Sequence, residues 1–160
     1  MNQTRRQTRR QTLQAAGGIG LYGALAAIGL LPATQAAAQE FNAAAFQAKS
    51  VADAMKALGA AAPAESRDVT IVAPDIAENG AVVPVGIKSS LPNTQFIALL
   101  IEKNPFALTG AYDILPGAEA EVNMRVKMGQ SSDAYALLRA DGKFYMARKE
   151  IKVTLGGCGG

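Results

Sequence analysis

The hydrophobic pattern changes to a period of two after Arg67, and this change narrows the possible folds more than any other feature. The alternation is clearest in residues 121–128, Glu-Val-Asn-Met-Arg-Val-Lys-Met. Successive side chains of a β-strand point to opposite faces, so this stretch should turn one face to water and the other to a core. Residues 95–101 are continuously apolar after the first. That pattern is expected of a central strand covered on both faces.

Turn residues separate the strand-like runs. Asp141-Gly142 is the strongest of these signals, because a two-residue Asp-Gly connection supplies the positive φ angles that a tight hairpin needs. We expect strands at residues 67–73, 81–88, 95–101, 107–114, 121–128, 134–139 and 143–154. About seven short strands at this spacing predict a mainly β fold, an immunoglobulin-like antiparallel β-sandwich over residues 67–154.

A short helical segment and a linker, residues 39–66, are expected before the sandwich. Residues 41–58 are rich in alanine and have helical character. Ser50 and Asp53 fit a capping box, in which the two side chains satisfy free backbone amides at the start of a helix. Residues 60–66 contain a proline and are expected to form the linker to the first strand.

Residues 1–38 have the order of regions that defines an export signal. A basic start without acidic residues is followed by an apolar stretch at residues 15–31 and then by three consecutive alanines that suit cleavage. Arg9 and Arg10 form the pair of a twin-arginine motif, with Thr12 where an aromatic residue is commoner. An ordinary signal with an arginine-rich start is the alternative. We expect export to the periplasm by the twin-arginine route, with no membrane insertion after cleavage.

Charge and composition exclude several classes of function. The formal charge of +3 becomes −1 once the four arginines of the signal are removed, so a nucleic-acid-binding surface has little support. The chain has no histidine and a single cysteine, which excludes histidine-assisted nucleophilic catalysis and the usual zinc or copper sites. No cofactor or metal is expected, and the methionines Met124, Met128 and Met146 are interpreted as core residues rather than copper ligands.

The single cysteine, Cys158, lies in the C-terminal sequence Gly156-Gly157-Cys158-Gly159-Gly160. Glycine has no Cβ, so the flanking glycines give the backbone freedom and leave the thiol as the only side chain of the tail. We predict that residues 155–160 form a flexible arm that can enter a narrow pocket of another protein. No imidazole or helix start lies near the thiol to activate it, which favours a carrier over a catalyst.

Other roles for Cys158 must be weighed. The thiol could link the chain to another subunit through a disulfide, and this exported structural or redox protein is the alternative function. A prenyl group is poorly supported, because its signal has three residues after the cysteine and Cys158 has two. A thiocarboxylate on Gly160, as in ubiquitin-like sulfur carriers, would require ATP, which an exported protein does not meet.

The terminal motif, the twin-arginine signal and residues 73–85, Ala-Pro-Asp-Ile-Ala-Glu-Asn-Gly-Ala-Val-Val-Pro-Val, together resemble the SoxY family. Members of this family are the sulfur-carrier subunits of the thiosulfate-oxidising Sox system. The similarity extends over essentially the whole chain after the signal. Cys158 and its flanking glycines are the residues that the resemblance assigns to the carrier site, and no catalytic residue is assigned.

The resemblance implies an immunoglobulin-like fold and a set of partners. SoxZ, a second small β-sandwich, would form a heterodimer with this chain. The c-type cytochrome pair SoxAX would join thiosulfate oxidatively to Cys158, and the dimanganese hydrolase SoxB would remove the terminal sulfonate as sulfate. The sulfane dehydrogenase SoxCD, where present, would oxidise the remaining sulfur before hydrolysis frees the cysteine.

Residues 75–84 allow two interpretations. Asp75 and Glu78 could suggest a pair of acid–base carboxylates, but no third polar partner accompanies them, so we interpret the segment as a turn between two strands. A contact with a partner protein is the alternative, since Val82, Val83 and Val85 would leave apolar surface on a strand.

Overall fold

The computed structural model describes residues 42–154, which form two β-sheets and a pair of short helices. The helices are α3 (Ala43–Gln47) and α4 (Val51–Ala57). The strands are β1 (Ala64–Glu65), β2 (Val69–Val72), β3 (Ile76–Ala77), β4 (Val83–Ser89), β5 (Thr94–Ile101), β6 (Leu108–Asp113), β7 (Glu121–Val126), β8 (Ser132–Ala140) and β9 (Lys143–Val153).

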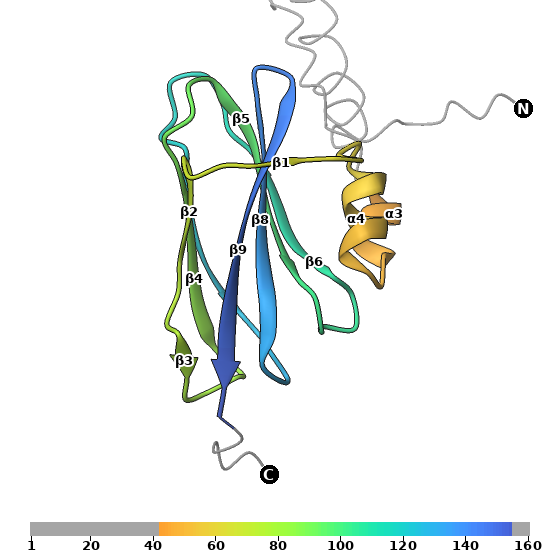
Figure 1. The fold of residues 1–160 in the computed structure, drawn as a ribbon, viewed down its shortest axis with the longest axis vertical. Coiled ribbons are helices and arrows are strands. Elements are labelled where there is room, and N and C mark those ends of the chain that lie inside the picture. Colours follow the sequence, from red (N-terminus) through yellow and green to blue (C-terminus); the bar gives the residue numbers. More distant parts are fainter. Residues whose placement is uncertain (1–41, 155–160) are drawn as a thin grey trace, which may run out of the picture. The chain divides into compact units, whose positions relative to one another are not determined.

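The larger sheet has the order β1-β9-β8-β5-β6, with β3 also paired to β9, and the smaller sheet has the order β2-β4-β7. The long strands all pair antiparallel, whereas the two-residue strands β1 and β3 run parallel to β9. The two sheets lie face to face (Figure 1). The prediction of an immunoglobulin-like antiparallel sandwich is therefore confirmed.

The larger sheet is buried on both faces. On the side of the smaller sheet, Ile97, Leu99 and Ile101 of β5 join the core of the sandwich. On the opposite side, Ala98 and Leu100 pack in a second core with residues of α3 and α4. This arrangement explains why the sequence of β5 is continuously apolar, because successive residues of a strand must satisfy two different apolar layers.

The N-terminal segment differs from the prediction in two places: two helices replace the single helical stretch expected, and the expected linker contains a strand. Helix α3 ends at Gln47, and α4 begins after Ser50, whose Oγ accepts a hydrogen bond of 3.0 Å from the amide of Asp53. The predicted cap is thus present, although the Asp53 carboxylate accepts a hydrogen bond from the Ser50 hydroxyl. The expected linker contains β1, which pairs with the edge of β9 because β8 occupies only the other edge of that strand.

The β8–β9 hairpin has the predicted two-residue connection. Asp141 and Gly142 have φ angles of 47° and 73°, and Ala140 pairs with Lys143. Asn93 Nδ2 donates a hydrogen bond of 3.0 Å to Asp141 Oδ1 and ties the hairpin to the start of β5. Because the hairpin sets the register, β9 runs the full length of the sheet and ends at the opposite end of the sandwich (Figure 1).

Within residues 42–154, neither helix has the length and hydropathy needed to span a membrane.

Candidate functional site

The predicted carrier residues lie at the C-terminal end of the chain. Cys158 and the glycines Gly156, Gly157, Gly159 and Gly160 lie outside the described residues, as do Arg9 and Arg10 of the predicted export motif. The structure does describe the point from which the predicted arm leaves the sandwich. We call Val153 and Thr154, the last residue of β9 and the residue after it, the arm root.

The arm root is bound on one edge by the segment that contains β3. Ile76 and Ala77 pair with Lys152 and Val153 in parallel register. The amide of Thr154 donates a hydrogen bond of 3.1 Å to the carbonyl of Ala77. Residues 75–84 therefore do more than turn between two strands, and the prediction of a simple turn is wrong. A parallel pair between segments so far apart in the sequence leaves no local signal, which is why the pattern did not reveal it.

Lys149 of β9 binds the same segment from the side. Its Nζ atom lies 3.0 Å from Asp75 Oδ1 and donates a hydrogen bond of 2.6 Å to the carbonyl of Ala73. The Lys149 side chain is 29% exposed, whereas that of Asp75 is 88% exposed, so the ion pair itself contributes little, at most about 1 kcal/mol. Asp75 is thus an ion-pair partner, and the acid–base interpretation of Asp75 and Glu78 finds no support in its contacts.

The other edge of the arm root is bound by Ser131. The last pair of the β8–β9 ladder joins Ser132 to Ile151, so backbone pairing with β8 ends two residues before Val153. The Ser131 side chain continues the bonding, because its Oγ accepts a hydrogen bond of 2.9 Å from the Val153 amide. The sequence analysis did not single out Ser131, since only its contact across 22 positions distinguishes it from other serines.

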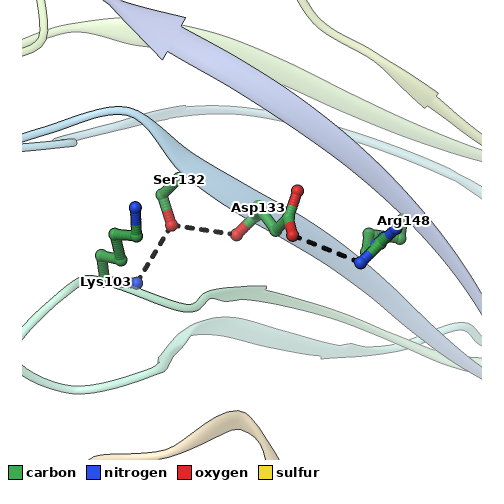
Figure 2. A network of polar contacts seen from close by, with 4 residues as sticks. All are labelled: Lys103, Ser132, Asp133 and Arg148. Carbon is green, nitrogen blue, oxygen red and sulfur yellow. Dashed lines mark hydrogen bonds and ion pairs between the residues drawn. The ribbon is translucent and has the colours of Figure 1, made fainter.

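A polar network follows Ser131 along the start of β8 (Figure 2). The Ser132 hydroxyl, in a residue that is 3% exposed, accepts a hydrogen bond from the Lys103 amide and donates one to the Asp133 carbonyl. The Asp133 carboxylate lies 3.5 Å from the Arg148 guanidinium. A hydrogen bond with Tyr135 and the charge of Asp133 raise the pKa of Arg148 above its usual value. The network joins the β5–β6 turn to β8 and stabilises the strand that precedes the hairpin.

Three large apolar side chains between the end of β2 and the start of β4 are exposed. Val72, Ile76 and Val82 are each about half exposed. The neighbouring Val83 and Val85 are buried in the sandwich core, so the predicted apolar surface is correct for Val82 and wrong for the other two. Val83 and Val85 share the inward face of β4 because residues two apart in a strand point the same way, and Pro84 between them is exposed.

Within residues 42–154, no group of three or more His, Cys, Asp or Glu side chains could hold a metal ion. The methionines occupy the core, as predicted. Met128 is buried between the sheets, with Met124 packed against the same cluster. Met146 of β9 packs against the second core, which lies between the larger sheet and the helices α3 and α4.

The structure defines the class of protein as a small antiparallel β-sandwich domain, and the comparisons with known proteins identify the family. A sequence model of the family described as "Sulfur oxidation protein SoxY" matches residues 54–158 and so reaches Cys158 itself. The chain belongs to the SoxY family.

A solved structure agrees with this assignment. The sulfur carrier protein SoxY from Chlorobium limicola f thiosulfatophilum is 36% identical, with a TM-score of 0.61, over 68% of this chain and 96% of that one. A superoxide reductase (neelaredoxin) from Ignicoccus hospitalis is 26% identical over 55% of this chain and 81% of that one, with a TM-score of 0.49. No curated protein sequence matches the chain.

Proposed function

We propose that this chain is an exported covalent carrier that holds thiosulfate-derived sulfur on Cys158 and presents it to enzymes of the Sox system. The observation that supports this most is the position of the cysteine in a chain of the SoxY family. Cys158 follows Thr154 by four residues, which reach at most roughly 14 Å beyond the arm root. The thiol can therefore enter a pocket while the sandwich stays outside.

The proposed chemistry begins with an oxidative coupling. The Cys158 thiol loses its proton and forms a sulfur–sulfur bond with the outer sulfur of thiosulfate, and the two electrons released pass to a cytochrome partner. Water then cleaves the bond between the sulfonate and the sulfane sulfur, which releases sulfate and leaves a persulfide on Cys158. Both adducts are covalent yet open to hydrolysis or further oxidation, as a transported intermediate must be.

The chain acts in this proposal as a substrate rather than a catalyst. Its sequence has no histidine that could serve as a general base, and it requires no cofactor of its own. SoxZ is the proposed heterodimer partner, and SoxAX, SoxB and, where present, SoxCD are the proposed enzymes that act on the arm. The proposed location is the periplasm, reached by the twin-arginine route through Arg9 and Arg10.

Intact mass measurement tests the proposal. The exported protein is purified from cells that oxidise thiosulfate and is measured without reductant. We expect sulfane and sulfonate adducts that map to Cys158 and disappear when a reductant is added. If disulfide-linked dimers are the only modified species, the alternative of a structural or redox link through Cys158 is favoured, and the carrier proposal fails.

Stiffening the arm tests whether its glycines matter. Replacing Gly156 and Gly157 together by valine should leave folding unchanged, because both residues follow the sandwich. β-Branched side chains restrict the backbone and add bulk beside the thiol, so thiosulfate oxidation should slow roughly tenfold. The rate is measured in cells that carry the variant as the only copy. Alanine at the same two positions is the matched control and should have the smaller effect. An unchanged rate with valine would show that pocket entry does not depend on a slender arm.

A further inference from the structure

Two segments that lie far from β9 in the sequence, residues 73–80 and 128–131, meet at the end of that strand. Residues 73–77 bind one edge of the strand, Ser131 binds the other, and Gly80 lies against both the strand and the turn before β8. A Cβ on Gly80 would overlap the carbonyl oxygen of Met128 and come within 2.8 Å of the Val153 side chain. Only glycine lets these segments approach so closely.

The hydrogen bonds on the β3 side continue past the end of the regular sheet. The carbonyl of Asp75 accepts a bond of 2.9 Å from the Lys152 amide, and the carbonyl of Ala77 accepts one of 3.1 Å from the Thr154 amide. The segment that supplies these carbonyls is held in turn by Lys149, through Ala73 and Asp75. These contacts therefore order the chain as far as Thr154, three residues beyond the last β8–β9 pair.

Ser131 completes this arrangement on the side where β8 is absent. Because β8 begins at Ser132, no backbone carbonyl of that strand faces the Val153 amide in the ladder, and the Ser131 hydroxyl takes that place. The Val153 side chain packs against the sandwich core, which holds the amide in position for the bond. The Ser131 hydroxyl thus binds the Val153 amide from one edge, while backbone carbonyls of the β3 segment bind the amides of Lys152 and Thr154 from the other.

We propose that residues 73–77, Lys149 and Ser131 form a root clamp that anchors the C-terminal arm at Thr154 and so sets the length over which Cys158 can swing. This inference rests on the proposed carrier function, and it assigns the clamp residues a positioning role, since none of them bears the sulfur. Without the clamp, Lys152, Val153 and Thr154 would leave the sheet and lengthen the tether to Cys158 by three residues.

The anchoring point matters because the effective concentration of a tethered group falls roughly as the −3/2 power of the tether length. Lengthening the free chain from residues 155–158 to residues 152–158 should therefore lower the local concentration of the thiol at a partner's pocket roughly twofold. A longer tether also reaches farther, so the clamp shortens the reach of the thiol and raises its local concentration near the sandwich.

The test uses the full mature protein and a Ser131→Ala variant, which removes the acceptor of the Val153 amide and leaves the backbone unchanged. Hydrogen exchange of the Val153 amide should become at least roughly fivefold faster, as expected for the loss of one hydrogen bond. A nitroxide pair on Cys158 and on an introduced Thr70→Cys should give a broader distance distribution. Thiosulfate oxidation should slow roughly twofold, and Ser131→Thr, which keeps the hydroxyl, should restore all three measurements.

Two further variants complete the design. Lys149→Met removes both contacts to the β3 segment and should speed the exchange of Lys152 and Thr154 in the same way. Ser90→Ala is the matched control, because that hydroxyl bonds to Asp68, away from the arm root, and its loss should leave the arm measurements unchanged.

The outcomes separate the clamp from the carrier function. If the arm-root amides and the distance distribution are the same in Ser131→Ala, Lys149→Met and the unmodified protein, the clamp does not exist. If Cys158 never carries a sulfur adduct, the proposed function fails, while the exchange and distance measurements still decide whether the arm is anchored at Thr154.

Discussion

Cys158→Ser is expected to abolish thiosulfate-dependent growth or oxidation in cells that carry it as the only copy. A serine hydroxyl cannot form the sulfur–sulfur bond that the proposed cycle needs, and the chain contains no second thiol that could replace it. The variant should fold normally, because position 158 lies four residues beyond the last residue that the structure describes. Its melting temperature should match that of the unmodified protein, and its intact mass should show no sulfur adduct.

The same variant separates the carrier from the disulfide alternative. Loss of oxidation together with loss of sulfane and sulfonate adducts supports a carrier, whether or not disulfide dimers are also lost. Normal oxidation by the Cys158→Ser strain would contradict the proposal directly, since no other residue of this chain could carry the sulfur. The proposed export signal is unchanged in the variant, so loss of that signal would not explain its phenotype.

Leu99→Ala and Leu100→Ala should each destabilise the fold by about 3 kcal/mol, although the two side chains lie on opposite faces of β5. Both residues are fully buried, so truncation loses apolar contact and leaves a cavity in either core. For a domain of this size the melting temperature should fall by roughly 10–20 °C. Denaturant unfolding and thermal unfolding followed by circular dichroism measure the two changes.

Leu115→Ala is the matched control for this pair. Leu115 is 72% exposed, and its truncation should change the free energy of unfolding by no more than about 0.5 kcal/mol. If Leu100→Ala cost no more than this control, the helical layer would not be packed on the sheet, and the second core would be wrong. If only Leu99→Ala left the free energy of unfolding nearly unchanged, the packing of the two sheets against each other would be wrong.

Sequence patterning predicted the fold wherever the determining signal was local. The alternation in residues 121–128 corresponds to β7, whose inward residues Val122, Met124 and Val126 pack in the sandwich core. The Asp141-Gly142 turn was recognisable because the positive φ angles belong to those two residues alone. The uninterrupted apolar run in β5 indicated burial on both faces, although it did not show that helices cover one face and a sheet the other.

The short strands escaped prediction because their cause is not local. β1 and β3 each have two residues, too few for any period to be visible, and both form only because β9 offers a free edge. The same holds for Ser131 and Lys149, which look like ordinary polar residues until β9 is placed beside them. Asp75 was noticed for its charge, but its partner lies on the last strand of the chain.

The prediction for Cys158 came from the sequence alone, because it depends on residue types: one thiol, four glycines beside it, and no histidine anywhere in the chain. Those facts, together with the family match, support the proposal that Cys158 is the group to be loaded. Where its arm begins was decided by the tertiary structure. The bonds to Ala77 and Ser131 at the arm root join residues 22 to 77 positions apart, and such contacts exist only once the sheets have formed.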